Sequence, residues 1–295
     1  MIVKQNGKCL TMNTYNDIYL ETRRRLRAGE IAAHDLEARL IVECATGKSR
    51  EELMKLRGLF VTDTTVLRAV EDMVARRLGG EPVAYIVGEW EFYGLPIIVN
   101  KSVLIPRVDT ELLADAVIAI AKNKRSRVLD LCAGSGCIGL AVAANVPNCR
   151  VLLADNSHEA LKISRANILK NRLTRNVTAI EADALQEPPE LLGRFDVIVS
   201  NPPYIPTGDI ESLDNSVRDY EPAYALDGGH DGLAFYRVIA SKWKSRLADG
   251  GYLAFECGVN QAESLREIME ENEFVDVRTL KDTLEIDRVV VGRLG

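Results

Sequence analysis

The order of apolar and polar positions divides the chain into a helical front segment and a longer segment of alternating strands and helices. Between residues 14 and 80, apolar residues recur at helical spacing, most clearly over 36–41 and 66–74. A Thr-Asp-Thr-Thr sequence before the second series can cap a helix, and Gly79-Gly80 followed by Pro82 ends the segment. The front segment is therefore predicted to be a small helical domain.

The remainder of the chain has the pattern of a covered, mostly parallel sheet. Residues 83–99 are rich in aromatic and β-branched residues broken by glycines, which predicts a β-hairpin between two domains. After Ile105, apolar segments alternate with amphipathic ones, as in a sheet with helices on both faces. Seven strands are expected, at 127–131, 150–154, 177–180, 195–200, 252–256, 274–278 and 288–291. Five helices are expected, at 111–121, 138–145, 159–171, 233–247 and 261–271. The predicted domains are 1–80, a hairpin over 81–104, and 105–295.

Composition is that of an ordinary globular protein, with 47% hydrophobic and 27% charged residues in 295. The six cysteines, among them Cys9, are irregularly spaced without a CxxC pair, which favours reduced thiols in a cytoplasmic protein. The first ten residues lack the apolar run of a signal peptide, and no stretch has the length of a membrane span. No metal site is predicted.

The charge is unevenly distributed along the chain. Residues 1–80 hold 14 basic and 11 acidic side chains, whereas residues 81–295 hold 23 and 32. The front segment is therefore +3 and the rest −9, within a total of −6. This balance argues against the strong basic footprint of a duplex nucleic acid binder.

A glycine-rich turn follows the first expected strand of the sheet. Gly134, Gly136 and Gly139 satisfy GxGxxG between strand 127–131 and helix 138–145. Such turns bring backbone N–H groups close to a nucleotide, although they also serve only to pack a helix on a strand. The strand before and the helix after favour the nucleotide interpretation.

Three carboxylates suggest which nucleotide binds. Asp130, directly before the turn, would repel a pyrophosphate but attract the sulfonium and ammonium groups of S-adenosylmethionine. Asp155 ends the next strand and is expected to accept hydrogen bonds from ribose hydroxyls, unless it only caps the following helix. Asp183, after the third strand, is expected near the adenine amine, unless it is simply a loop carboxylate.

The sequence Asn201-Pro202-Pro203-Tyr204 directly follows strand 195–200 and precedes a long loop, to residue 232, without clear periodicity. The Asn201 side-chain oxygen and the Pro202 carbonyl can accept the N–H groups of a planar nitrogen and direct its lone pair toward a sulfonium methyl. Pro203 stiffens the turn, and Tyr204 offers a ring face to a flat substrate. Methyl transfer to nitrogen is therefore predicted, with no side-chain general base; the alternative is a plain turn that closes a strand.

Four stretches together resemble the release factor glutamine methyltransferase family (PrmC or HemK). They are DLCAGSG (130–136), NPPY (201–204), LIPRVDTE (104–111) and the hairpin GEPVAYIVGEWEFYG (80–94). The resemblance covers nearly the whole chain. It implies an α/β fold, a seven-stranded Rossmann-like class I methyltransferase sheet, with a small N-terminal helical domain joined by a β-hairpin.

The activity implied by the resemblance is methyl transfer from S-adenosyl-L-methionine to a protein, leaving S-adenosyl-L-homocysteine. The acceptor would be the side-chain amide nitrogen, N5, of the glutamine in the Gly-Gly-Gln (GGQ) loop of class 1 peptide chain release factors. A cytoplasmic monomer is expected, with no direct nucleic acid and no membrane partner. The front domain would recognise substrate.

The resemblance also assigns the site residues by position. Cofactor contacts would come from Cys132, Ala133, Gly134, Ser135, Gly136, Asp155, Ala184 and Asn201, beside Asp130 and Asp183. Asn201, Pro202, Pro203 and Tyr204 would hold the glutamine. Arg107 and Glu111 would shape its pocket or only pair with one another at a helix start. Three positions depart from the family pattern: Cys132 for Gly, Val108 for Pro, and Ala184 where some members have an aromatic residue.

Several alternatives stay open at this point. NPPY also occurs in enzymes that methylate adenine, but these need a basic region that this chain lacks, and a related enzyme methylates a ribosomal protein glutamine. A nicotinamide-dependent dehydrogenase is opposed by Asp130, and a non-catalytic module leaves NPPY without a purpose. Arg23, Arg24 and Arg25 of the front domain are either a contact for an acidic release factor face or a solvated helix face.

Overall fold

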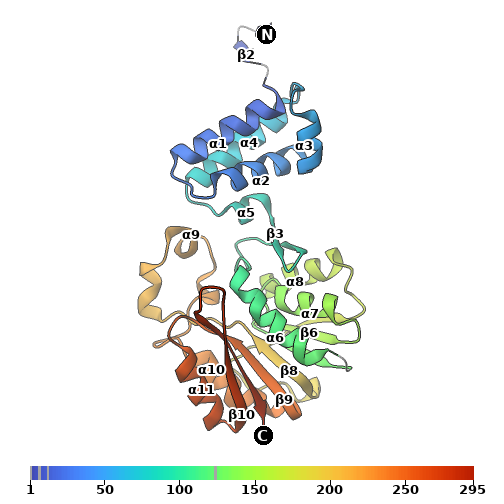
Figure 1. The fold of residues 1–295 in the computed structure, drawn as a ribbon, viewed down its shortest axis with the longest axis vertical. Coiled ribbons are helices and arrows are strands. Elements are labelled where there is room, and N and C mark those ends of the chain that lie inside the picture. The colour runs from blue at the N-terminus through green and yellow to red at the C-terminus, as the bar shows by residue number, and fades with distance from the viewer. Residues whose placement is uncertain (1, 6–7, 12, 123–124) are drawn as a thin grey trace. The chain divides into compact units, whose positions relative to one another are not determined.

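In a computed structural model, the chain forms two compact units, Met1–Gly88 and Glu89–Gly295 (Figure 1). The structure describes residues 2–5, 8–11, 13–122 and 125–295, and side chains from residue 13 onward. The side chain of Cys9 lies outside this part. The five other cysteines, Cys44, Cys132, Cys137, Cys149 and Cys257, are free thiols. The roles expected of the sequence segments remain predictions.

The smaller unit is a bundle of helices preceded by two short strands, β1 (Ile2–Gln5) and β2 (Lys8–Thr11). Its helices are α1 (Tyr15–Ala28), α2 (His34–Thr46), α3 (Arg50–Leu56), α4 (Thr64–Leu78) and α5 (Val83–Val87). The side chain of Asp63 accepts a hydrogen bond from Thr65 N at the start of α4, which confirms the expected cap. Leu26, Ile41 and Val74 are fully buried between the helices.

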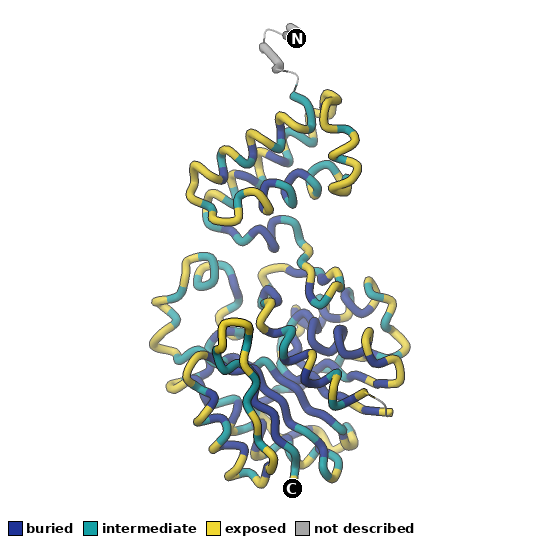
Figure 2. Tube along the Cα trace, viewed as in Figure 1, coloured by how far each residue is buried: buried dark blue, intermediate teal, exposed yellow. Residues whose placement is uncertain are grey.

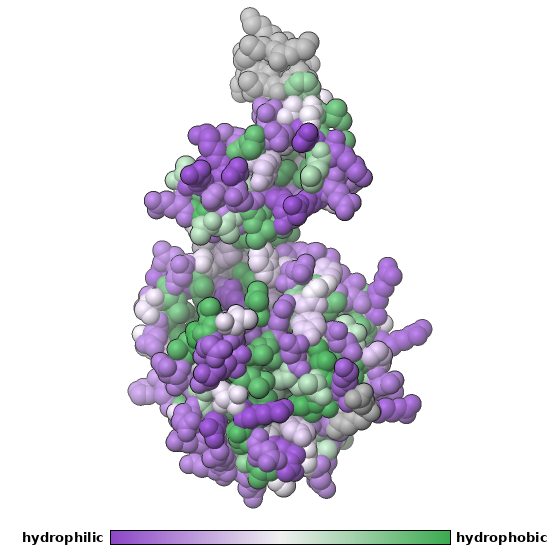
Figure 3. Space-filling view, viewed as in Figure 1, coloured by the Kyte–Doolittle hydropathy of each residue, from purple (hydrophilic) through white to green (hydrophobic). Residues whose placement is uncertain are grey.

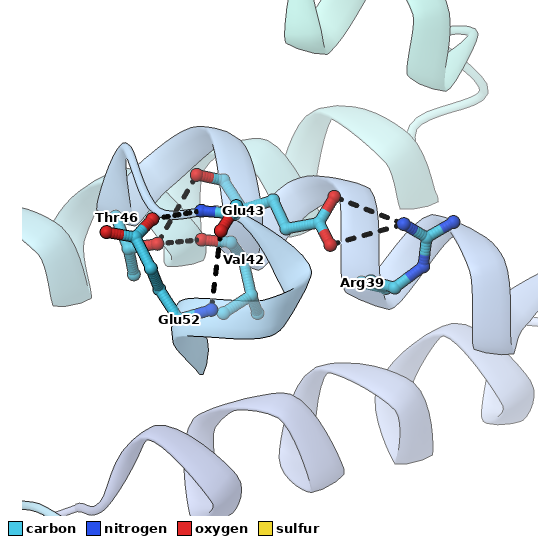
Figure 4. A network of polar contacts seen from close by, with 6 residues as sticks. Arg39, Val42, Glu43, Thr46 and Glu52 are labelled. Atoms are coloured by element: carbon cyan, nitrogen blue, oxygen red, sulfur yellow. Dashed lines mark hydrogen bonds and ion pairs between the residues drawn. The ribbon is translucent and has the colours of Figure 1, made fainter. Parts of the chain in front are cut away.

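Local polar contacts hold the turn from α2 to α3 (Figure 4). Arg39 pairs with Glu43 one helical turn later at 3.2 Å, and the Thr46 hydroxyl donates to the Val42 carbonyl at 2.7 Å. The Glu52 carboxylate in turn accepts from the backbone N–H of Ser49 at 2.8 Å. The last of these bonds satisfies a backbone N–H that the start of α3 would otherwise leave unpaired.

The expectation of a strand from residue 83 is wrong, because Val83–Val87 form the short helix α5. Pro82 precedes its first turn, Gly88 ends it in a left-handed conformation with φ of 78°, and α5 packs on α2 and α4. Packing within the bundle therefore outweighs the strand propensity of Val, Tyr and Ile. The hairpin itself begins at residue 89, as β3 (Glu89–Phe92) and β4 (Leu95–Ile98), and belongs to the larger unit.

The larger unit contains a seven-stranded sheet in the order β10-β11-β9-β8-β5-β6-β7. Strands β5 to β9 are parallel, whereas β11 runs antiparallel to both β9 and β10. The bounds are β5 Arg127–Leu131, β6 Arg150–Asp155, β7 Val177–Glu181, β8 Phe195–Ser200, β9 Leu247–Glu256, β10 Phe274–Lys281 and β11 Asp287–Leu294. The order reverses beside β5, where ligands of open α/β sheets bind.

Helices cover both faces of this sheet and bury its central strands (Figures 1 and 2). On one face lie α6 (Glu111–Ala121), α7 (Cys137–Asn145) and α8 (His158–Lys170); on the other lie α10 (Ala234–Lys242) and α11 (Ala262–Glu271). Alternation along β5 turns Leu129 and Leu131 into the core with α10 and α11, and Asp130 toward α7. The buried acid of β5 thus belongs to the face that carries the glycine turn.

The expected α/β class and the seven strands are confirmed, with β5, β8 and α6 matching to the residue. The helix expected at 233–247 ends earlier, at Lys242, followed by the 3-10 helix η5 (Trp243–Arg246). The other 3-10 helices are η1 (Val108–Thr110), η2 (Glu190–Leu192), η3 (Thr207–Ser212) and η4 (Ala223–Ala225); α9 spans Asn215–Arg218. In the described part, no helix combines the length and apolarity needed to cross a bilayer. Figure 3 shows polar side chains over most of the visible face of each unit, with apolar ones in smaller groups.

Candidate active site

The principal cleft of the larger unit opens where the parallel strands β5, β6 and β8 end. The space inside it, its open mouth and solvent included, is about 800 Å³. Nine of the residues expected at the site line it, namely Arg107, Cys132, Ala133, Gly134, Ser135, Asp155, Ala184, Asn201 and Pro203. Asp130, Gly136, Asp183, Pro202 and Tyr204 do not line it.

The glycine turn is tied to both neighbouring strands. Ala133 N donates to the Ala154 carbonyl at 3.0 Å, and Gly134 N donates to the Asp155 carboxylate at 2.8 Å. A Cβ on Gly139 would lie 2.3 Å from the Leu153 side chain, so only glycine lets α7 approach the sheet here. Cys132 adopts a left-handed conformation with φ of 61°, which agrees with the glycine usual at that position.

Asp130 lies beneath the turn and is fully buried. Its Oδ2 accepts a hydrogen bond from Gly139 N at 2.8 Å, while Oδ1 has no partner among the described residues. Burial raises the pKa of this carboxyl to about 7, and the charge of Asp155 acts in the same direction. A buried acid with one unsatisfied oxygen is a group that a nearby cation would stabilise.

Asp155 reaches the cleft from the end of β6. Its two oxygens accept from Gly134 N and from Ser157 N at 2.9 Å, and burial raises its pKa. The helix cap is Ser157, whose side chain accepts from Ala160 N, so Asp155 itself is not the cap of α8. Its carboxylate therefore links the glycine turn to the start of α8 while facing the cleft.

The third acid, Asp183, does not line the cleft. The Asp183 carboxylate accepts from Leu185 N at 2.9 Å within its own loop, and its flanking residues Ala182 and Ala184 line the cleft instead. Tyr224 also lines it, with its hydroxyl bonded to the Ser102 carbonyl at 2.5 Å and to Ser157 Oγ at 3.2 Å. Loop 201–232 thus contributes a wall of the cleft, through a residue that the sequence did not single out.

The NPPY turn begins where β8 ends, opposite the glycine turn. Ser200 donates through its hydroxyl to the Leu131 carbonyl at 2.5 Å, which joins the ends of β8 and β5. Asn201 Nδ2 donates to Thr110 Oγ1 at 3.4 Å. Asn201 and Pro203 line the cleft, and burial raises the pKa of the Tyr204 hydroxyl. The turn places one carboxamide in the same cleft as Asp155.

Loop 201–232 folds back on the turn and fixes its backbone. Ile205 N donates to the Leu226 carbonyl at 3.0 Å, and Gln261 Nε2 donates to the Tyr204 carbonyl at 2.8 Å. A Cβ on Gly232 would lie 2.3 Å from the Tyr204 oxygen, and the φ of Gly232 is 74°. Glycine is therefore required at residue 232 for the loop to reach the turn.

The alternative that Arg107 and Glu111 only pair with one another is wrong. Arg107 instead forms an ion pair with Glu221, whose buried carboxylate also accepts from Ile105 N at 3.3 Å. Glu111 accepts from the backbone N–H of Tyr93 at 2.7 Å. Arg107 still lines the cleft, and its ion pair joins segment 104–111 to loop 201–232.

One carboxylate, Asp155, and one guanidinium, Arg107, line the cleft, and the further acids Asp130 and Asp183 lie near its wall at Cys132. The pKa of the Cys132 thiol is raised by burial and further by the charges of Asp155, Asp130 and Asp183, which all act in the same direction. Among the described residues, no cluster of three or more potential metal ligands occurs. The acidic surroundings and the close backbone approach at the glycine turn fit an adenosyl cofactor with a positively charged centre.

Sequence reasoning missed Glu256, the last residue of β9, which is buried behind Asn201. Thr110 lies within the LIPRVDTE stretch, which gave it no role of its own, and no local pattern in the sequence indicates Tyr224. Parallel strands end at one edge of a sheet, so the adjacency of β8 and β9 would have brought Glu256 and Asn201 together.

Comparisons with known proteins agree with this geometry. Residues 108–213 match the family described as Methyltransferase small domain, and residues 17–88 match PrmC N-terminal domain. A release factor glutamine methyltransferase of Geobacter sulfurreducens is 42% identical over 267 residues, 88% of this chain and 89% of that protein. One of Clostridium acetobutylicum is 38% identical over 260 residues, 88% and 91% of the two chains.

Among solved structures, the catalytic domain of hMettl16 in complex with MAT2A 3'UTR hairpin 6 superposes with a TM-score of 0.57. It is 16% identical and covers 76% of this chain and 82% of its own. This similarity concerns the methyltransferase fold alone.

Proposed function

This chain belongs to the release factor glutamine methyltransferase family, and we propose that it methylates N5 of the glutamine in the GGQ loop of class 1 peptide chain release factors. The donor is S-adenosyl-L-methionine. The observation that carries the proposal is the meeting of Asn201 with Asp155 and the glycine turn in one cleft. One side of that cleft suits an adenosyl group, and the other presents a carboxamide oxygen to an N–H donor.

The proposed cofactor site uses the glycine turn and the acidic residues around it. Backbone at Cys132–Gly136 approaches the ligand, Asp155 accepts from the ribose hydroxyls, and Ala184 lies beside the adenine. Asp130 and Asp183 contribute charge from behind the wall. When bound, the cofactor supplies an electrophilic methyl: the amide nitrogen forms the new N–C bond as the S–C bond breaks, and the sulfur keeps that electron pair.

The proposed work of the protein is to position the acceptor amide. Asn201 Oδ1 and the Pro202 carbonyl accept its two N–H groups, which aims the lone pair along the line of displacement. Pro203 keeps this turn rigid. The ring face that Tyr204 was expected to offer the planar amide does not line the cleft. The methylated nitrogen then sheds one proton to water, so no side-chain base is required.

The proposed partner is a release factor, acted on in the cytoplasm by a monomer. The helical unit is proposed to recognise the body of that substrate. Three neighbouring arginines of α1 are paired within this unit: Arg23 with Asp35, Arg24 with Glu21 and Arg25 with Glu71. These pairs favour the solvated-face interpretation of that helix.

The proposal is tested by one methyl-transfer assay with three acceptors: a release factor, a ribosomal protein and an adenine-containing oligonucleotide. We expect the release factor to be methylated at least about 100-fold faster, as kcat/KM, than either alternative, a difference of about 2.7 kcal/mol. Faster transfer to the ribosomal protein or to the oligonucleotide would assign the activity to that substrate class. A melting temperature raised by S-adenosylmethionine, and not by NAD, excludes the dehydrogenase.

A further inference from the structure

A buried carboxylate stands directly behind the catalytic asparagine. Ser200 of β8 pairs in register with Phe255 of β9, so Asn201 and Glu256 are the next residues on two neighbouring parallel strands. Glu256 is 3% exposed and does not line the cleft. A charge so deeply buried is costly unless other groups compensate it, which calls for a reason specific to this position.

Three side chains form a connected polar group here. Asn201 Nδ2 donates to Thr110 Oγ1. The side chains of Thr110 and Asn201 lie near enough to the Glu256 carboxyl to lower its pKa against the effect of burial. Thr110 is 1% exposed, so water does not compete for its hydroxyl. Glu256 Oε2 has no hydrogen-bond partner in the part of the chain that the structure describes.

The donor and acceptor capacities of these groups allow one arrangement when Glu256 is ionised. A carboxylate only accepts, so the Thr110 hydroxyl donates to it and turns its lone pairs toward Asn201. The Asn201 amide must then turn its NH2 group inward. The opposite orientation is unfavourable, because Asn201 Oδ1 would then face a carboxylate and a hydroxyl whose proton is already donated to that carboxylate.

We propose that Glu256 is a positioning residue that holds the Asn201 carboxamide, directly and through Thr110, with Oδ1 free to accept the N–H of the substrate amide. This inference rests on the proposed function and adds to it the residue that decides which way Asn201 faces. Without Glu256, both orientations of the carboxamide become accessible. A flipped amide would present its NH2 group to the N–H of the substrate amide, so the hydrogen bond that directs the reacting nitrogen would be lost.

The charge state of Glu256 gives the arrangement a pH dependence. Burial raises the pKa of Glu256 to about 7, and the charge of Asp109 acts in the same direction. The side chains of Thr110 and Asn201 and the charge of Arg288 act against this rise. The other titratable groups that its charge influences are Tyr204, Tyr236, Cys137 and Cys257. A protonated Glu256 can donate to the Thr110 hydroxyl, which can then donate to Asn201 Oδ1. The oxygen would no longer be held free for the substrate, so kcat is expected to fall below pH 7.

The test is steady-state kinetics on a GGQ peptide together with equilibrium binding of S-adenosylmethionine. Glu256→Gln and Thr110→Val are each expected to lower kcat by about 10- to 100-fold, because a misdirected acceptor impairs alignment more than binding. Their dissociation constants for S-adenosylmethionine should stay within about twofold of wild type. Thr110→Ser, which keeps the hydroxyl, should recover most of the kcat that Thr110→Val loses.

Further readouts separate positioning from a merely structural role. Glu256→Gln should lose the fall in kcat that the wild type shows below pH 7, and the exposed Glu271→Gln should match the wild type throughout. If Glu256→Gln does not fold, the comparison of Thr110→Val with Thr110→Ser still distinguishes a positioning role from a merely structural one.

Three results would overturn the inference alone: wild-type kcat in Glu256→Gln, equal losses in Thr110→Val and Thr110→Ser, or loss of cofactor binding in parallel with kcat. A wild-type protein that leaves the peptide unmethylated would overturn the proposed function and this inference with it.

Discussion

Two buried acids, Asp130 and Glu256, lie at the ends of strands beside the cleft without lining it, and burial raises the pKa of each to about 7. Asp130 lacks a partner for one oxygen, as does Glu256. Such groups reduce the free energy of unfolding of the empty protein and are retained where a ligand or a reacting group needs them. At the scale of single residues, the site is therefore built at the expense of stability.

The cost of Asp130 is measurable as a pH-dependent stability. The pKa of its carboxyl is higher in the folded protein than in the unfolded chain, so between about pH 4 and pH 7 the folded state holds a proton that the unfolded state has released. The free energy of unfolding therefore falls as pH rises through this window, by on the order of 4 kcal/mol for this group. Asp130→Asn removes that contribution.

We expect the stability of Asp130→Asn, relative to wild type, to rise steadily from pH 4 to pH 7 and to level off above. Chemical denaturation at a series of pH values measures this, with Asp209→Asn at an exposed position as the control. A difference between Asp130→Asn and wild type that stays constant across the series would contradict the assignment.

Asn201 is the residue on which methyl transfer depends most directly. Asn201→Ala removes the side-chain acceptor and is expected to lower kcat by at least about 100-fold while the KM for S-adenosylmethionine changes little. Initial rates with a GGQ peptide measure both constants. Asn148→Ala, in an exposed turn before β6, should retain the wild-type rate, and full activity in Asn201→Ala would refute this role.

The residues of the site differ in how well the sequence could predict them. Asp155 and Asn201 directly end or follow strands and were expected where the structure has them, facing the cleft. Glu256 looked like part of an apolar strand, and the partner of Arg107 lies more than a hundred residues away at Glu221. Local patterns cannot reveal such pairings, because they depend on strand order and on how a long loop folds back.

At the scale of elements, close backbone approach determines where α7 and loop 201–232 sit. Any side chain at Gly139 would meet Leu153 and Val151, at 2.3 and 2.9 Å, and the Asp130 carboxylate at 3.1 Å. The same helix supplies the N–H that bonds Asp130. Gly139 therefore determines both how closely α7 packs on the sheet and where the N–H that bonds Asp130 lies.

Gly139→Ala is accordingly expected to destabilise the protein by about 1–3 kcal/mol, the usual cost of overpacking a core. Its affinity for S-adenosylmethionine should also fall, since the turn shifts with α7. Thermal unfolding and ligand titration measure the two effects. Gly208→Ala is the matched control, because a Cβ there meets nothing within 4 Å; equal stability of the two variants would contradict the packing argument.

Elements were predicted best where burial and periodicity agreed. Strands β5 and β8 are buried over almost their whole length, and α6 buries one regular apolar face. Residues 83–87 were assigned to a strand because Val, Tyr and Ile favour one, yet they pack as a helix on α2 and α4. Tertiary packing decided this short segment, and nothing within its own five residues could have shown it.

At the scale of the whole molecule, the sequence separates a +3 front segment from a −9 remainder. The arginine row of α1 is already paired within the helical unit, so it adds little to any field that steers a substrate. Reversing the charges of Arg23, Arg24 and Arg25 together is expected to leave the KM for a release factor within about twofold of wild type. Initial-rate kinetics at low and physiological salt test this, and a large, salt-sensitive rise in KM would establish charge recognition by α1.

The central claim, that the chain methylates one glutamine amide of a release factor, is tested most directly by locating the methyl group. A release factor is incubated with the protein and S-adenosylmethionine, digested, and sequenced by tandem mass spectrometry. We predict a single added methyl group on the side chain of the glutamine in Gly-Gly-Gln, and none when that glutamine is replaced by asparagine or when Asn201→Ala is used. An unmodified tripeptide, or a methyl group on another residue, would contradict the account.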